Sequence, residues 1–391
     1  MEIVFFVHAD FLESQSMPRF AKMMSDGMAE RGHVVSIWAP KPRFIRLPVH
    51  RKMRKWLGYL DQFLVFPVEV KRKVKNCSKD TIFVFTDHAL GPWVPLVAAL
   101  PHVIHCHDFL AQRSGLGEIS ENISSWTGRQ YQRYIRRGYS KGKNFISVSQ
   151  KTREDLHRFL NAVPPLSAMV YNGLNQAFMP NDPVLAGELL SKRTGTDLSS
   201  GFILHVGGNP WYKNRLGVIE IYNAWRSLSK SGLPLLLIGD APSVELVAAH
   251  SQSSYKSDIH FISKLEDEFV RLAYSGASVF MFPSLAEGFG WPIAEAMASG
   301  CPVITTNEAP MTEVAGNAGF TISRRPHRLN GFSGWASEGA KVLEQVLTLS
   351  PEERRFEIEK GLLNAKRFDT NTALNQVEDI YKEIVESYKS K

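Results

Sequence analysis

The sequence predicts an α/β protein with two doubly wound domains, each a mostly parallel sheet covered by helices on both faces. Three observations support this prediction. The chain has 391 residues, which suits two domains of roughly 150–200 residues better than one. Short β-branched and aromatic runs alternate with helical patterns along the chain. Near the three-quarter point a buried strand leads into a glycine loop and then a helix, a geometry that offers free backbone N–H groups to an anion.

The N-terminal half begins with a strand–helix–strand pattern. Residues 2–8 and 34–39 predict two buried strands, and the helix between them has an apolar row that includes Phe20, Met24 and Met28. Such a unit forms part of a parallel sheet. No Gly-x-Gly-x-x-Gly follows the first strand, so the dinucleotide-binding fingerprint is absent.

The overall composition is that of an ordinary globular protein. An apolar content of 44% and a charged content of 22% are ordinary for a globular protein. No apolar run reaches the ~18 residues that a transmembrane helix needs. The N-terminus reads as a first strand and not as a signal peptide, because it lacks a basic leading region. Cys77, Cys106 and Cys301 have no metal-ligand spacing, so we expect a reducing, cytoplasmic location.

Charge is unevenly distributed along the chain. Residues 1–177 hold 25 Lys and Arg against 14 Asp and Glu, whereas residues 178–391 hold 21 against 25. This asymmetry predicts an anionic partner for the N-terminal half. Within it, residues 41–76 carry 11 basic and 2 acidic residues. No nucleic-acid-binding motif accompanies this charge, so we do not expect a nucleic acid partner.

Aromatic and apolar residues interleave with the basic residues of this segment. Trp56, Tyr59, Leu60 and Phe63 recur at helical spacing, so a helix would place them on one side. Basic residues beside such a side suit an anionic membrane surface, which predicts peripheral attachment to the inner face of the plasma membrane. The alternative is that the aromatic residues pack inward and the charges are only solvated.

Two glutamates mark the glycine loop near the three-quarter point. Residues 277–282 predict the strand that precedes the loop, and the helix that follows ends at Gly300. Glu287 lies in the loop and Glu295 in the helix. Carboxylates accept hydrogen bonds from paired hydroxyls, so both suit a sugar or ribose ring. The alternative is that Glu295 only offsets the helix dipole and Glu287 is a solvated charge.

Residues 283–304 resemble the donor-site signature of retaining GT-B glycosyltransferases of family four, glycosyl transferase group 1. The match comprises the same two glutamates, separated by seven residues, and the same trailing Gly-x-Pro-Val strand. This resemblance implies two Rossmann-like domains that face one another across a cleft. It implies an acceptor-binding domain over 1–175, a nucleotide-sugar donor domain over 176–370, and a helix over 371–391 that crosses back to the first domain.

The resemblance also implies roles for individual residues. Glu287 would position the donor sugar and support positive charge in the transition state, and Glu295 would hold the ribose hydroxyls. His107, at a strand end, would contact the sugar. Lys213 would be the countercharge of the diphosphate. The other donor-binding residues it implies are Asp108, Gly207, Gly208, Gly239, Gly288, Phe289 and Gly290.

One element of the family pattern differs in this sequence. The family usually has an arginine a few residues before its lysine, and Gly208 and Asn209 occupy that place here. Arg215 is a candidate replacement for the missing arginine. Its position on a helix predicts a direction different from that of Lys213.

Together with the resemblance, these features predict a transferase that moves a sugar from a UDP- or GDP-linked donor to an acceptor hydroxyl. The resemblance implies that configuration is retained. The sequence shows no metal constellation, so we expect no cofactor. The resemblance to the family implies that the departing phosphate oxygen takes the acceptor proton. A lipid-linked saccharide acceptor in bacterial surface polysaccharide or glycolipid assembly would suit the basic N-terminal half. Two alternatives stay open. One is an epimerase, hydrolase or phosphorylase of sugar phosphates, and the other is a non-catalytic nucleotide-sugar-binding protein.

Overall fold

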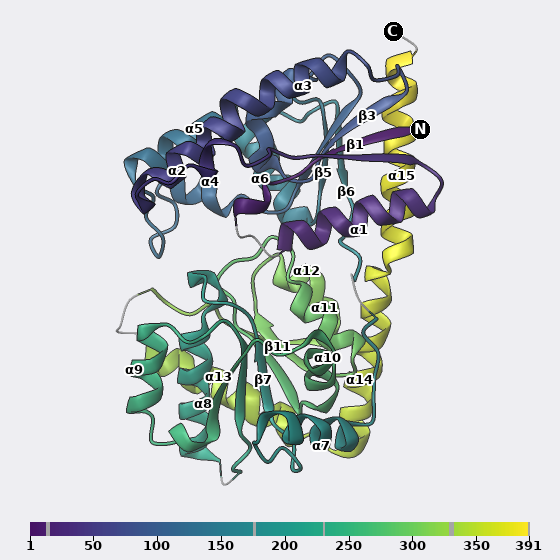
Figure 1. Ribbon diagram of the computed structural model, residues 1–391. Helices are drawn as coiled ribbons and strands as arrows, with labels where there is room; N and C mark the ends of the chain where they lie inside the picture. The colour runs from purple at the N-terminus through teal and green to yellow at the C-terminus, as the bar shows by residue number, and fades with distance from the viewer. Residues whose placement is uncertain (13–15, 175–176, 230, 328–331, 390–391) are drawn as a thin grey trace. The chain divides into compact units, whose positions relative to one another are not determined.

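The computed structural model describes residues 1–12, 16–174, 177–229, 231–327 and 332–389. Contacts divide the chain into two compact units (Figure 1). Unit 1 comprises Met1–Ile119, Ile123–Asn175 and Thr370–Lys391, and unit 2 comprises Ser120–Asn122 and Gln176–Asp369. Each unit contains a six-stranded sheet in which every strand pair is parallel. The predicted pair of doubly wound α/β units is therefore confirmed.

The sheet of unit 1 has the order β2-β1-β3-β4-β5-β6. Its strands are β1 (Glu2–Phe6), β2 (Val34–Trp38), β3 (Thr81–Phe85), β4 (His102–Cys106), β5 (Asn144–Ser147) and β6 (Leu166–Met169). Strands β3, β4 and β5 are buried along their whole length, because helices cover both faces of the sheet. Their apolar runs are therefore continuous and not alternating.

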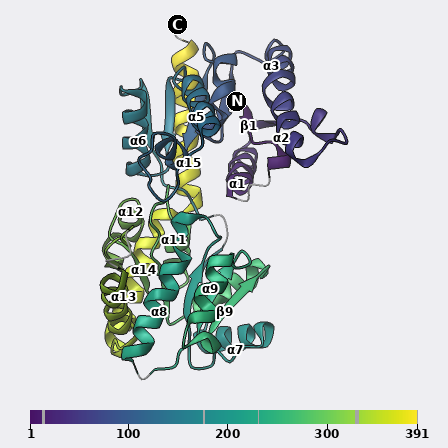
Figure 2. The ribbon, with the colours of Figure 1, turned by 90° about the vertical axis from the view of Figure 1, so that its left-hand side faces the viewer.

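Helices of unit 1 pack on the two faces of this sheet. One face contacts α3 (Phe66–Val74), α5 (Trp126–Tyr139) and α6 (Gln150–Leu160) through a large aromatic core. The other face contacts α1 (Ser16–Glu30) and α15 (Thr370–Lys389). The short helix α4 (Leu110–Gly115) follows β4, and α2 (Arg51–Leu60) runs through a π-helical turn, Asp61–Val65, into α3. Figure 2 shows α2 and α3 near β1, with α6 at the opposite side.

The C-terminal helix α15 belongs to unit 1 although it follows unit 2 in the sequence. It buries Leu374, Val377, Tyr381 and Ile384 along one face, as the helical spacing of these residues predicts. The hydroxyl of Tyr381 lies 2.7 Å from Nε2 of His105 in β4. This contact ties the end of the chain to the centre of the first sheet.

The sheet of unit 2 has the order β12-β11-β10-β7-β8-β9. Its strands are β7 (Ile203–Val206), β8 (Leu235–Gly239), β9 (Ile259–Ser263), β10 (Val279–Phe282), β11 (Val303–Thr306) and β12 (Gly319–Ile322). The core on one face includes α8 (Arg215–Leu228), α9 (Val244–Gln252) and α13 (Phe332–Leu347). The remaining helices are α7 (Pro183–Thr194), α10 (Asp267–Gly276), α11 (Trp291–Ala298), α12 (Met311–Ala315) and α14 (Pro351–Ala365).

This topology fixes where the loops of unit 2 meet. The carboxyl ends of parallel strands lie at the same edge of a sheet, which is where open α/β sheets bind ligands. Strands β10 and β8 flank β7. The loops that follow these three strands are therefore neighbours, although long segments of sequence separate them.

Candidate functional site

Three glycines lie where the loops after β7 and β8 touch. Gly239 has a φ of +144°, and a Cβ on it would lie 2.1 Å from the carbonyl oxygen of Gly207. A Cβ on Gly208 would lie 2.5 Å from Oδ2 of Asp240. The Cβ on Gly239 would collide with backbone, so Gly239 is needed for this close approach of the two loops, whereas the Cβ on Gly208 would meet only side-chain atoms. The predicted contact of the three glycines with a donor stays a prediction.

Lys213 and Glu287, predicted as catalytic residues, form an ion pair in unit 2. Lys213 ends the short 3-10 turn Trp211–Lys213 after β7, and Glu287 lies in the loop after β10. The ammonium Nζ donates to Oε1 of Glu287 at 2.8 Å, and the two side chains are 16% and 8% exposed. Nζ also lies 4.9 Å from the ring centroid of Phe282. The site therefore holds a mostly desolvated charge pair at the carboxyl edge of the sheet.

Asn214 holds the lysine loop against the glutamate loop. Its backbone is left-handed, with a φ of +51°, and its Nδ2 donates to the carbonyl of Pro283 at 2.8 Å. The N–H of Leu285 donates to the carbonyl of Tyr212 at 2.7 Å. The sequence analysis missed this role of Asn214. An asparagine just before a helix is the signal that could have found it, since asparagine tolerates the left-handed region better than most residues.

Arg215, the candidate replacement for the missing family arginine, faces into the loop. Its Nη1 donates to Oδ1 of Asn209 at 2.6 Å and to the carbonyl of Asp240 at 3.0 Å. The side chain is 4% exposed, and burial lowers the pKa of its guanidinium. Its centre lies 5.6 Å from the ring of Phe261. In this structure Arg215 braces the loop through Asn209 and Asp240. Whether it replaces the missing family arginine stays a prediction.

The glycine loop after β10 leads into α11 as the sequence predicts. Gly290 precedes the helix with a φ of +104° and offers no capping side chain. Phe289, predicted to contact the donor, is buried, and its ring packs edge-on against Phe368 at 5.4 Å. A donor contact from Phe289 would therefore come from its backbone. The role predicted for Gly288 and its neighbours stays a prediction.

Glu295 lies on α11 and accepts a hydrogen bond from a tyrosine. The hydroxyl of Tyr274, on α10, donates to Oε2 of Glu295 at 2.8 Å. Burial, together with the Glu295 charge, raises the pKa of Tyr274 well above its usual value. Tyr274 is thus a neutral donor that orients the carboxylate. The sequence analysis missed this residue, which carries no local signal apart from its apolar surroundings.

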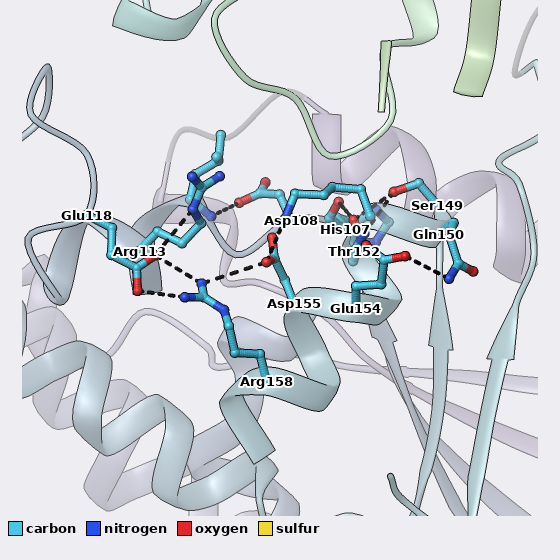
Figure 3. A network of polar contacts seen from close by, with 12 residues as sticks. His107, Asp108, Arg113, Glu118, Ser149, Gln150, Thr152, Glu154, Asp155 and Arg158 are labelled. Atoms are coloured by element: carbon cyan, nitrogen blue, oxygen red, sulfur yellow. Dashed lines mark hydrogen bonds and ion pairs between the residues drawn. The ribbon is translucent and has the colours of Figure 1, made fainter. Parts of the chain in front are cut away.

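His107 and Asp108 follow β4 in unit 1 (Figure 3). Nε2 of His107 lies 2.9 Å from the carbonyl of Thr86, and burial lowers the pKa of the imidazole. Oγ1 of Thr152 donates to the His107 carbonyl at 3.1 Å, and Oδ1 of Asp108 accepts from the N–H of Leu110 at 2.9 Å. His107 is therefore a neutral ring fixed at Nε2. Its predicted contact with a sugar stays a prediction.

A second polar cluster lies at the same edge of unit 1. His8 follows β1, and Asp87 and His88 follow β3. Nε2 of His8 and Nδ1 of His88 each lie 2.9 Å from an oxygen of Asp87. Burial would raise the pKa of Asp87, but the two imidazoles hold it well below its usual value. The sequence analysis missed these residues, although each follows a strand end just as His107 does.

The basic segment of unit 1 presents fewer aromatic residues to solvent than predicted. Tyr59 stacks on Tyr131 of α5 at 5.7 Å, and Phe63 contacts the ring of Tyr134 at 5.5 Å. The helical spacing places Trp56, Tyr59 and Phe63 on one side as predicted, since their rings follow one another in contact. Tyr59 and Phe63 are nevertheless half-buried against α5, so the alternative of inward packing holds for these two. Trp56 itself is 61% exposed. Met53, Leu64 and Val68 are also exposed.

Two kinds of feature are absent from the described residues. No helix there is long and apolar enough to cross a membrane. In the same parts of the chain, no group of three or more His, Cys, Asp or Glu side chains is placed to hold a metal ion.

Family models match both halves of the chain. The model described as Glycosyltransferase Family 4 matches residues 17–178, and the model described as Glycosyl transferases group 1 matches residues 201–330. The first range contains His107, and the second contains Lys213 and Glu287.

Individual proteins show the same relationship. The chain is 25% identical over 260 residues to O-antigen chain mannosyltransferase B of Escherichia coli, which covers 65% of this chain and 64% of that protein. It is 23% identical over 182 residues to O-antigen chain mannosyltransferase RfbU of Salmonella typhimurium, covering 46% and 47%. The chain thus spans less than two thirds of the length of these curated relatives.

A solved structure shows the same fold over nearly the whole chain. Anabaena Alr3699/HepE, in complex with UDP and glucose, matches with a TM-score of 0.70 at 17% identity and covers 97% of this chain and 98% of its own. The fold is GT-B, as the sequence predicts. Each half of the chain matches a model of the same enzyme group, and this protein therefore belongs to the group 1 glycosyltransferases of family four.

Proposed function

We propose that this glycosyltransferase transfers a sugar from a nucleotide-diphosphate sugar to an acceptor hydroxyl, with retention of configuration. The observation that carries the proposal is the Lys213–Glu287 ion pair at the glycine loops of unit 2. A lysine beside free backbone N–H groups is a suitable countercharge for a diphosphate. A carboxylate next to it suits the positive charge that develops on a sugar as its bond to phosphate breaks.

No protein-bound metal is required in this proposal. Lys213 and the backbone N–H groups at the start of α11 would stabilise the departing diphosphate. A departing phosphate oxygen would take the acceptor proton, so no side chain has to act as the base. Glu287 would position the sugar, and Glu295, oriented by Tyr274, would hold the ribose hydroxyls.

The relatives favour a particular class of product. Two of them are named O-antigen chain mannosyltransferases, and we propose transfer of mannose in the assembly of a surface polysaccharide. The base of the donor is left to experiment, since HepE was solved with UDP and glucose.

The test is a transfer assay with several donors. Purified protein is incubated with GDP-mannose or UDP-glucose, with and without a membrane extract as the source of acceptor, and nucleotide release and the anomer of the product are measured. Acceptor-dependent release with retained configuration is expected, and EDTA should leave it largely intact. Release of free sugar or an epimer without acceptor would contradict a transferase. Strict dependence on added Mg²⁺ or Mn²⁺ would contradict the role given to Lys213.

We also propose that the exposed part of the basic segment attaches unit 1 to an anionic membrane. Trp56, Met53 and Leu64 supply exposed apolar area beside exposed basic residues such as Arg54 and Lys55. Each basic residue near an anionic leaflet contributes about 1 kcal/mol, and apolar insertion supplies the second signal that stable attachment needs.

Vesicle co-sedimentation tests this attachment. Binding to phosphatidylglycerol vesicles should be strong at ~0.05 M salt and fade by ~0.5 M, as the Debye length shrinks. Trp56→Ser should weaken binding. Phe356→Ser is the matched control, because Phe356 in unit 2 is 60% exposed, close to the 61% of Trp56. Absence of binding at low salt, or equal loss in both variants, would contradict the proposal.

A further inference from the structure

A cavity of about 430 Å³ lies beside the basic segment of unit 1. Its walls come from three parts of the chain that are distant in sequence: the turn after β1, the loop before α2 with α2 itself, and α5. The side chains that give it an apolar and aromatic lining are Phe11, Leu12, Ile45, Tyr59 and Tyr131. A cavity of this size and lining is typical of a small-molecule site.

The walls of this cavity are held in place by buried polar contacts. Asp61 is 1% exposed, and its carboxylate accepts from the backbone N–H groups of Arg43, Phe44 and Ile45 at 3.1, 2.9 and 3.0 Å. These bonds fix the loop that carries Ile45. A Cβ on Gly58 would lie 3.2 Å from Cδ1 of Ile45, so the glycine lets α2 approach the loop closely. The cavity is therefore built by specific contacts.

Two basic side chains line the cavity and have no acidic partner among the residues that the structure describes. Arg54 and Lys55 line it, and both side chains are exposed. No carboxylate of the described residues lies within ion-pair distance of either, whereas Arg43 is paired with Glu69. Nζ of Lys55 lies 5.7 Å from the ring centroid of Tyr59. Two basic side chains beside an apolar cavity match an anion that carries an apolar chain.

We propose that this cavity binds a lipid phosphate, that is, a phosphate or diphosphate ester of a long apolar alcohol. The chain would occupy the space between Ile45, Tyr59 and Tyr131, and the phosphate would lie against Arg54 and Lys55. This site rests on the proposed function, because it would bind the lipid part of a lipid-linked acceptor.

Two neighbouring features support this occupant. The cavity adjoins the exposed apolar residues of α2, including Trp56, so a chain leaving a membrane surface could enter it. Phe11 and Leu12 follow β1 by only a few residues, and this loop also carries His8. The lipid phosphate would thus be held beside the carboxyl edge of the sheet, where His8 and Asp87 meet.

The experiment measures binding of farnesyl diphosphate to the full chain by isothermal titration. Farnesol and inorganic pyrophosphate serve as the two half-ligands. We expect farnesyl diphosphate to bind more tightly than either. Arg54→Ser/Lys55→Ser should weaken its binding by about tenfold or more, because two charge-assisted contacts are lost. Leu12→Trp, which places a bulky side chain at the cavity, should weaken it as well.

The matched control is Lys71→Ser/Arg72→Ser, which removes the same charge from exposed positions of α3 that do not line the cavity. Equal loss in both double variants would mean nonspecific electrostatic attraction and would overturn the proposal. So would a lack of binding, pyrophosphate binding as tight as that of farnesyl diphosphate, or loss only in Lys213→Ala. Nucleotide binding is measured on the same samples. If GDP and UDP fail to bind while farnesyl diphosphate binds, the proposed function fails and the lipid-phosphate site stands.

Discussion

The ion pair between Lys213 and Glu287 makes a prediction that a double-mutant cycle can measure. The substitutions are Lys213→Met, which keeps an unbranched apolar stem, Glu287→Gln, and both together. At the observed 2.8 Å, two unit charges attract one another by about 6 kcal/mol at an effective dielectric constant of about 20. The cost of desolvating the mostly buried side chains offsets much of this attraction.

Each single variant should therefore lose about 2–3 kcal/mol in the free energy of unfolding, since it leaves one charge mostly buried and unpaired. The double variant should lose little more than either single one. The resulting coupling energy should be about 1–3 kcal/mol. Urea denaturation of all four proteins, followed by circular dichroism, measures it. Losses that simply add would show that the pair does not stabilise the protein.

The same cycle in saturating nucleotide separates a structural from a catalytic role. If a diphosphate takes over Lys213, the coupling between Lys213 and Glu287 should shrink when GDP or UDP is bound. Wild-type protein should gain about 2.7 kcal/mol at a nucleotide concentration of a hundred times the dissociation constant. Lys213→Met should bind nucleotide more weakly and gain less. An unchanged coupling energy with unchanged nucleotide affinity would refute the assignment of Lys213 to the diphosphate.

Three further predictions concern single groups. Glu287→Gln should lower turnover by about a hundredfold, or about 3 kcal/mol, with little change in nucleotide affinity, and near-normal steady-state turnover would contradict its role. Glu295→Gln should weaken nucleotide binding in calorimetry, and Tyr274→Phe, which removes only the hydroxyl that Glu295 accepts from, should weaken it less; equal affinities in all three proteins would count against the ribose site. Burial lowers the pKa of His105 and of His205 in the folded protein to about 3. At any pH between about 3 and the ordinary histidine pKa of 6.5, the unfolded chain therefore binds more protons than the folded protein. Stability should thus be full above pH ~6.5 and fall by about 1.4 kcal/mol per pH unit for each histidine as the pH drops towards 3, which denaturation at pH 7, 5 and 4 measures; His205→Gln should flatten the profile.

The sequence predicted the fold well because local patterns carry it. Strand-length apolar runs alternate with helical ones, and that alternation favours parallel sheets. The loop and helix around Glu287 were predictable for a similar reason, since Pro292 and Gly300 mark the first turn and the end of one helix. Each of these features depends on residues close together in the chain.

Local sequence patterns could not predict the contacts between segments that are distant in the chain. Lys213 meets Glu287 because β10 pairs with β7, although β8 and β9 lie between them in the sequence. The spacing of Tyr59 and Phe63 correctly places both on one side of a helix. It could not show that α5, some seventy residues later, covers that side. Burial of an amphipathic face depends on which element packs against it, and helical periodicity contains no information on the partner.

The Lys213–Glu287 pair also suggests how the proposed site can hold a buried cation and a buried carboxylate before any substrate binds. Without substrate, each side chain neutralises the other, so two mostly buried charges are tolerated at one sheet edge. When a diphosphate binds Lys213, the negative charge of Glu287 loses part of its compensation. Its field then acts on the neighbouring sugar, where positive charge develops as the bond to phosphate breaks. Binding of the diphosphate to Lys213 would thus leave the charge of Glu287 free to stabilise the sugar as the diphosphate departs. The fall in the coupling energy between Lys213 and Glu287 on adding nucleotide measures this effect directly.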